Sequence, residues 1–262
     1  MEMIIDPFNG VFFGSFGLFI VALIVASLLL RKKSERTREL VLAFSMIGAC
    51  LVFIWYKIML SLDADYSVIL VENNISAFNW WKELPLQLCN INMILIPVAV
   101  FTKNDALKGF SFFMGPLGAL MALIMPATGF HGYSLLLPRN LGYYITHYMV
   151  FVGAIALASF KLYRPTYKKI LPAFLALMVV SLFTFGVNML LRVTGAAQAN
   201  YFYSVETEGN VILEFFHNLI PVPFLYLVPA GIIIGLPYMF LVTTGFVVAD
   251  KIKAKKQAKA ES

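Results

Sequence analysis

Seven long apolar stretches are the feature that most constrains the fold of this 262-residue chain. A helix of about 20 apolar residues is long enough to cross a bilayer. Hydrophobic residues make up 60% of the chain, charged residues only 13%, and the mean hydropathy is +0.82. We therefore predict an all-α polytopic membrane protein with seven transmembrane helices, at about 11–30, 40–60, 84–101, 107–126, 141–160, 170–191 and 221–248. The last is long enough to be tilted, or broken near Pro229 or Pro237.

The charged residues between these stretches predict the orientation. Basic residues gather in alternate intervals, at 31–38, 103–108, 161–169 and 251–259, and acidic residues gather in the others. The positive-inside rule then places the amino terminus outside and the carboxyl terminus in the cytoplasm. We expect one membrane domain, residues 1–250, followed by a basic cytoplasmic tail, residues 251–262. The net charge of +6 lies in short clusters beside the membrane, so nucleic acid is not an expected partner.

The sequence gives little support for a metal site, a disulfide or a cleaved signal peptide. The two cysteines, Cys50 and Cys89, lie inside predicted helices, so we expect neither a disulfide framework nor a zinc site. Glu214 and His217 share a helical face in the segment 209–219, which is predicted to be a short interfacial or re-entrant helix. A metal centre needs further ligands on neighbouring helices, so no metal and no cofactor are expected. The first residues lack a basic stretch, and no cleaved signal peptide is expected.

Polar side chains recur at one depth in the predicted outer half of the bilayer. At 1.5 Å per residue, Cys89 lies about 9 Å below Glu83 and His147 about 12 Å below Arg139. Asn188 also falls in the outer half, and His217 lies just before the last stretch. Unpaired polar groups are costly in hydrocarbon, so such residues face the bundle interior and often mark function.

Helical spacing suggests how these groups are arranged. At about 100° per residue, Gln87 shares a helical stripe with Glu83 and Asn90. Cys89 and Asn92 lie near the opposite side. A base for Cys89 must then come from another helix, and His147 is the best candidate. Tyr143 and Tyr144 are on the same helical stripe as His147, so a tyrosine hydroxyl is a candidate to orient the imidazole. Candidate substrate-binding residues are Glu83, Gln87, Asn92, Tyr144, Asn188 and His217.

A thiol and an imidazole at one depth point to covalent acyl transfer. A thiolate attacks an ester carbonyl, and the imidazole takes the thiol proton and later activates the acceptor. Amide side chains such as Gln87, Asn92 or Asn188 are candidate donors to the oxyanion. The alternatives are that Cys89 is a packing thiol and that His147 is a buried neutral histidine. Two other features have structural interpretations. Lys57 is expected to extend its ammonium to the interface, and the glycines and prolines at 115–118 permit close packing or a kink rather than bind phosphate.

Several features, taken in order along the chain, resemble the YwaF-type family of bacterial integral membrane proteins. They are the stretch LPLQLC at 84–89, His147, Asn200-Tyr201 and the proline-rich entry to the last helix. The resemblance implies a multi-pass protein of the bacterial cell membrane and adds Asn200 and Tyr201 to the candidate binding residues. A distantly similar vertebrate branch is associated with cysteine-dependent acyl transfer between phospholipids. That similarity implies Cys89 as nucleophile and His147 as its partner. The family usually has His where this chain has Gln87.

The leading hypothesis is a lipid acyltransferase or thioester-forming hydrolase in which Cys89 and His147 act in the outer half of the bilayer. Its expected partners are membrane phospholipids, and protein partners are unknown. The main alternative is a non-enzymatic carrier or sensor that binds a small or lipidic solute in a polar cavity. A third is a scaffold subunit whose outer loops bind another membrane protein.

Overall fold

The computed structural model is all-α, with 72% of the chain helical. It describes residues 3–261; residues 1 and 2 of the predicted domain and residue 262 of the predicted tail lie outside this range. Within the described part, the one strand pair joins β1 (Ile4–Ile5) to β2 (Tyr133–Ser134), antiparallel. This pair holds the amino-terminal segment against the loop that precedes α6.

Six helices are long and apolar enough to cross a membrane, and they match six of the seven predicted stretches. They are α1 (Gly10–Leu30), α2 (Glu35–Leu62), α5 (Asp105–Ile124), α6 (Pro138–Ser159), α7 (Tyr167–Val193) and the run Leu227–Lys259. Side-chain oxygens cap the first turns of three of them: Asn9 before α1, Ser34 before α2 and Asn104 before α5. Such caps satisfy amide groups that have no partner within the helix.

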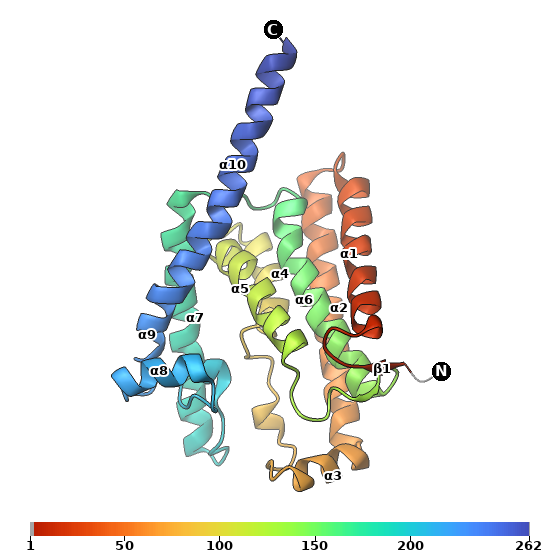
Figure 1. Cartoon of the computed structure of the whole chain (residues 1–262), viewed down its shortest axis with the longest axis vertical. Coiled ribbons are helices and arrows are strands. Elements are labelled where there is room, and N and C mark those ends of the chain that lie inside the picture. The colour runs from red at the N-terminus through yellow and green to blue at the C-terminus, as the bar shows by residue number, and fades with distance from the viewer. Residues whose placement is uncertain (1–2, 262) are drawn as a thin grey trace.

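The last run contains a π-helical turn between its two prolines, near the positions where the sequence predicted a tilt or a break. It consists of α9 (Leu227–Ala230), the π-helical turn η3 (Gly231–Gly235) and α10 (Leu236–Glu261). A proline cannot donate the hydrogen bond that its position in a helix requires. A wider turn next to Pro229 and Pro237 absorbs this loss without breaking the helix. In Figure 1, α10 continues well beyond the other helices.

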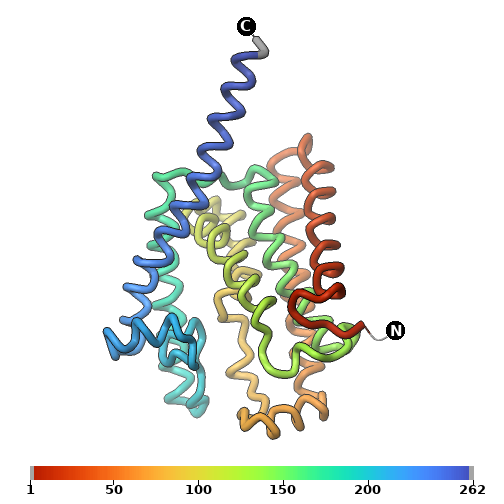
Figure 2. The backbone as a smooth tube through the Cα atoms, in the orientation of Figure 1, coloured from red at the N-terminus to blue at the C-terminus, as the bar shows by residue number. Residues whose placement is uncertain are grey.

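The third predicted stretch is only half helical, which corrects the sequence interpretation. α4 covers Asn92–Phe101, and residues 84–91 form consecutive turns after the short helix η1 (Trp80–Lys82). Pro85 disfavours helical geometry for Leu84 and donates no hydrogen bond. The predicted stripe of Glu83 and Gln87 is therefore wrong, as is the depth computed for Cys89 from helical rise. Figure 2 shows the stretch between α3 and α4 as an irregular trace.

The connections lie at two ends of the bundle. The α1–α2 hairpin, the α6–α7 connection and the carboxyl end lie at one end; α3 (Ala64–Glu72) and α8 (Val211–Leu219) lie at the other (Figure 1). The helix predicted at 209–219 is confirmed as α8, capped by Asn210, and it lies crosswise to α7 (Figure 1). The basic intervals 31–38 and 161–169 and the basic tail thus share one end.

The interior is built around α2, α5 and α6, whereas α1, α7 and α10 present large apolar side chains outward, among them Leu29, Val179 and Leu241. Helices pack closely where a glycine faces its neighbour: Gly142 of α6 lies against Tyr56 of α2. Close approach through small residues is typical of membrane helices, where packing rather than water exclusion drives association. Together, the apolar exterior and the long helices identify a multi-pass membrane protein.

Candidate functional site

The Cys89 thiol and the His147 imidazole meet inside the bundle. The Sγ of Cys89 lies 3.4 Å from Nε2 of His147. Both side chains are buried, with 7% and 3% of their surface exposed. Cys89 comes from the turns before α4, and His147 comes from the middle of α6. A nucleophile and a base at this separation have the geometry that covalent catalysis requires.

The second nitrogen of the imidazole fixes its tautomer. Nδ1 of His147 lies 2.7 Å from the main-chain oxygen of Tyr143. A carbonyl oxygen only accepts, so Nδ1 carries the ring proton and Nε2 presents its lone pair to the thiol. The tyrosine hydroxyls do not orient the ring, contrary to the sequence interpretation: Tyr143 donates to the main-chain oxygen of Ala122. The Tyr144 hydroxyl is buried without a hydrogen-bond partner among residues 3–261.

The turn that carries Cys89 leaves main-chain donors free beside the sulfur. The amide of Ile91 donates to the oxygen of Gln87 at 3.0 Å, and that of Asn92 donates to the oxygen of Cys89 at 3.2 Å. The N–H groups of Cys89 and Asn90 lie in the same turn as the sulfur, and neither has an oxygen acceptor in the described part of the chain. Free N–H groups in the turn of a nucleophile are candidate donors to an oxyanion.

The amide side chains proposed for that role hold the backbone instead. Gln87 accepts from the main-chain N–H of Phe202 at 3.2 Å. Asn92 donates to the oxygen of Leu88 at 2.7 Å, and its own oxygen is buried without a partner in the described range. Asn188 is fully buried on α7 and bonds both main-chain polar groups of Tyr201.

Tyr201 joins the loop after α7 to the segment that carries Cys89. It begins η2 (Tyr201–Tyr203). Its hydroxyl donates to the main-chain oxygen of Trp81 at 2.7 Å and accepts from the N–H of Leu84 at 2.9 Å. Burial raises the pKa of this phenol, so it remains a donor. Phe202 and Tyr203 follow with φ of 60° and 52°, a costly conformation for aromatic residues that tertiary contacts must enforce.

Two other predicted residues form no hydrogen bond with the thiol or the imidazole in the described part of the chain. Asn200 organises its own loop, donating to the main-chain oxygen of Glu206 and the side chain of Glu208. His217 lies on α8, edge-on to the ring of Tyr226. The structure thus brings Cys89 and His147 together and uses Gln87, Asn188 and Tyr201 to hold the surrounding chain.

Lys57 is the residue whose importance the sequence reading missed. The prediction that it extends to the interface is wrong: it is 8% exposed and forms an ion pair with Glu83. The carboxylate of Glu83, predicted to bind substrate, therefore pairs with a lysine of α2. The sequence held a usable signal, because a lysine within an apolar helix requires a carboxylate at its own depth, and Glu83 begins the stretch that contains Cys89.

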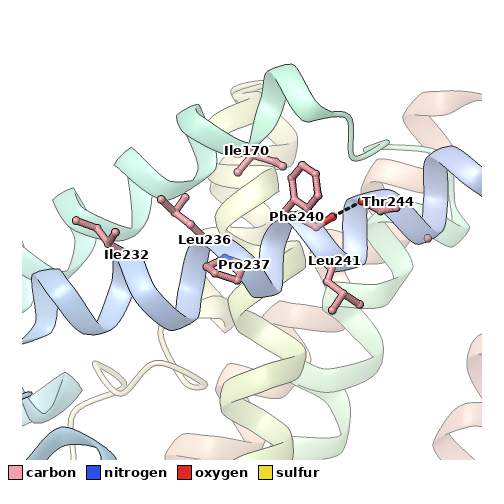
Figure 3. Close-up of a pocket in the computed structure, with 8 residues that line it drawn as sticks. Ile170, Ile232, Leu236, Pro237, Phe240, Leu241 and Thr244 are labelled. Atoms are coloured by element: carbon pink, nitrogen blue, oxygen red, sulfur yellow. Dashed lines mark hydrogen bonds between the residues drawn. The ribbon is translucent and has the colours of Figure 1, made fainter. Parts of the chain in front are cut away.

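A separate groove lies on the outside of the bundle, between α7 and α10. It has a volume of about 950 Å³ and is lined by Ile170, Leu236, Phe240 and others, with no titratable side chain among them. Figure 3 shows these apolar residues converging from the two helices. The polar side chain in the lining is that of Thr244, whose hydroxyl donates to the main-chain oxygen of Phe240. The groove therefore lacks the thiol and the imidazole of the interior site.

Gly118 of α5 lets the Cys89 turn lie close to that helix. A Cβ at this position would lie 3.1 Å from the amide nitrogen of Cys89 and 3.2 Å from Cγ of Leu88. We expect Gly118→Ala to destabilise the protein by roughly 1–3 kcal/mol through overpacking, measured as a lower thermal midpoint in detergent. Gly14→Ala is the matched control, because a Cβ there meets nothing within 4 Å. Equal midpoints for the two variants would contradict the assigned packing.

The chain was compared with known proteins by family, by sequence and by structure. No curated protein and no solved structure matches it. The model of the TMEM164 family matches residues 11–243, a range that contains Cys89, His147 and every helix described above except the first residue of α1 and the carboxyl-terminal part of α10. The chain therefore belongs to the TMEM164 family, a family of membrane proteins.

Proposed function

We propose that this protein is a thiol-dependent phospholipid acyltransferase or lipid hydrolase that works within the membrane. The observation that carries the proposal is the distance of 3.4 Å between the Cys89 sulfur and Nε2 of His147. The YwaF-like motif at 84–89, and the link of a similar vertebrate branch to acyl transfer, support it. In this proposal the short helix α4 and its preceding turns form the third of seven membrane segments, with the amino terminus outside.

The first half-reaction forms a thioester. Nε2 of His147 takes the proton of the Cys89 thiol, and the thiolate attacks the ester carbonyl carbon of a phospholipid. As the S–C bond forms, the carbonyl π electrons move to oxygen, where the N–H groups of Cys89 and Asn90 stabilise the negative charge. The tetrahedral intermediate then collapses: the C–O bond breaks, and the departing lysolipid oxygen takes the proton from His147.

The second half-reaction returns the enzyme to its starting state. An acceptor hydroxyl, from a lysolipid or from water, gives its proton to Nε2 of His147 and attacks the thioester carbon. The new C–O bond forms, the C–S bond breaks, and the proton returns from His147 to the sulfur. The product is a new phospholipid ester if a lysolipid attacks, or a free fatty acid if water does.

The test is to find the acyl group on the protein. Purified protein is mixed with a phospholipid that carries a labelled acyl chain, quenched, and digested for mass spectrometry. We expect a hydroxylamine-sensitive acyl group on the peptide that contains Cys89. Cys50 is a built-in control, because this half-buried thiol has no histidine contact within residues 3–261.

Two variants make the test decisive. Cys50→Ala should keep the labelled adduct, and Cys89→Ala should lose it together with acyl transfer. Transfer that continues at the full rate in Cys89→Ala would overturn the proposal. Saturable lipid binding without turnover, unaffected by Cys89→Ser, would instead favour a carrier or sensor.

A further inference from the structure

The segment that carries Cys89 is held by the loop after α7 rather than by a helix of its own. Residues 84–91 form turns, so the position of the thiol depends on contacts from outside the segment. The hydroxyl of Tyr201 donates to the main-chain oxygen of Trp81 at 2.7 Å and accepts from the N–H of Leu84 at 2.9 Å. These two hydrogen bonds fix the chain where it enters the turns.

A second contact holds the turn around the thiol. The side-chain oxygen of Gln87 accepts from the N–H of Phe202, the residue after Tyr201, at 3.2 Å. The main-chain oxygen of Gln87 accepts from the N–H of Ile91 at 3.0 Å, which closes the turn that contains Cys89. Gln87 therefore joins η2 directly to the turn of the thiol.

The loop is itself anchored on α7. Asn188 is fully buried on that helix, and its amide bonds both the N–H and the oxygen of Tyr201, each at 2.9 Å. An amide that pairs with both main-chain groups of one residue fixes the orientation of that residue. We call Asn188, Tyr201 and Gln87 the brace, because they form a continuous series of hydrogen bonds from α7 to the turn of Cys89.

The imidazole is held by a different element. Nδ1 of His147 lies 2.7 Å from the main-chain oxygen of Tyr143, one turn earlier on α6. The two reacting groups therefore meet at 3.4 Å from separately anchored parts of the chain. Helix α6 sets the position of the ring, and the brace sets the position of the sulfur.

The backbone conformation next to the brace supports a role in the site. Phe202, whose N–H contacts Gln87, has a φ of 60°, which is costly for an aromatic residue. Backbone strain of this kind persists only where surrounding contacts enforce it, and it concentrates at functional sites.

We propose that Tyr201 is a positioning residue that, together with Gln87 and Asn188, holds the Cys89 thiol against the imidazole of His147. This inference rests on the proposed function for its purpose, but the contact between thiol and imidazole can be tested without any lipid. The alternative is that the Tyr201 hydroxyl only satisfies main-chain groups that lack helical partners. Its loss would then lower stability and leave the effect of the imidazole on the thiol unchanged.

The experiment measures how much His147 accelerates the alkylation of Cys89 by iodoacetamide, in a Cys50→Ala background with one remaining thiol. An imidazole that takes the thiol proton speeds this reaction, so His147→Gln should slow it on the order of 10-fold or more. In a Tyr201→Phe background, which keeps the ring and removes the hydroxyl, His147→Gln should slow it by less than about threefold, because the two changes act on one contact. Any easier access of the reagent cancels in this ratio, since Tyr201→Phe is present in both proteins compared.

Tyr238→Phe is the matched control. The hydroxyl of Tyr238 also donates to a main-chain oxygen, that of Phe113 at 3.1 Å, but it links α10 to α5. We expect the full effect of His147→Gln in this background. Gln87→Met keeps the length of the side chain and removes the acceptor for the N–H of Phe202, so it should weaken the His147 effect as Tyr201→Phe does. It supplies the same test if Tyr201→Phe gives no monodisperse protein.

Three results would overturn the inference and leave the brace a structural contact. The first is a full His147 effect in monodisperse Tyr201→Phe and Gln87→Met proteins. The second is the absence of any His147 effect when the brace is intact. The third is an equal loss of the effect in Tyr238→Phe, because the loss of any bonded tyrosine hydroxyl would then suffice.

These outcomes are independent of acyl transfer. A His147 effect that requires the brace, without any acyl adduct, would refute the proposed function and leave the inference about positioning intact. An acyl adduct on Cys89, with the same His147 effect before and after Tyr201→Phe, would support the function and refute the inference.

Discussion

Replacing His147 with glutamine is expected to slow acyl transfer by about 100- to 10,000-fold, the usual contribution of general acid–base catalysis. The imidazole is the one base at hydrogen-bond distance from the Cys89 sulfur in the described part of the chain, and both half-reactions pass a proton through it. Glutamine keeps a polar side chain of similar length that can donate to the oxygen of Tyr143, so the fold of α6 should survive. The measurement is the single-turnover rate of thioester formation from a labelled phospholipid.

His131→Gln is the matched control for this change. His131 lies in the loop before α6 and contacts the carboxylate of Asp6 at 3.6 Å, so its loss should leave the rate within about threefold of the native value, as expected for a surface substitution. A His147→Gln protein that is monodisperse and forms the thioester at the native rate would remove the imidazole from the mechanism. An equal loss in both variants would point to damaged protein rather than lost catalysis.

Hydropathy was sufficient to predict most of the fold, because a segment that crosses lipid must meet one simple requirement. A crossing segment must satisfy its own main-chain hydrogen bonds, so about 20 apolar residues in a row predict a helix. α1 and α7 follow this rule directly. The stretch at 84–101 met the same criterion, but its residues 84–91 are not helical. There the protein itself supplies the partners that a helix would otherwise provide, such as the Tyr201 hydroxyl for the N–H of Leu84.

The candidate site could be predicted in part for the same physical reason. A thiol and an ionisable ring at similar depth suggested that Cys89 and His147 meet, and their side chains lie 3.4 Å apart. The surrounding polar groups could not be assigned, because their partners come from an irregular turn and from the loop after α7. Asn188, for example, is committed to the main chain of Tyr201, a contact that helical spacing does not encode. The roles of the two reacting groups stay predictions until an adduct is found.

Gly142→Ala is expected to disrupt the packing on which the whole site depends. A Cβ at this position would overlap Cβ of Tyr56 and lie 2.7 Å from its Cγ. Neither atom is at the free end of a flexible side chain, so rotamer changes cannot relieve the clash, and α2 must move away from α6. Overpacking in a well-packed core costs about 1–3 kcal/mol and occasionally more, and we expect the upper end of that range. The measure is the thermal midpoint in detergent and the yield of monodisperse protein.

The same displacement should also disable the chemistry, because His147 lies five residues after Gly142 on α6. Moving α6 away from α2 shifts the imidazole relative to the Cys89 sulfur, so Gly142→Ala should form the thioester slowly even in the fraction that remains folded. Gly48→Ala, on α2 where a Cβ meets nothing within 4 Å, should keep both the native midpoint and the native rate of thioester formation. A stable Gly142→Ala protein that forms the thioester at the native rate would show that the contact between these helices does not position the site.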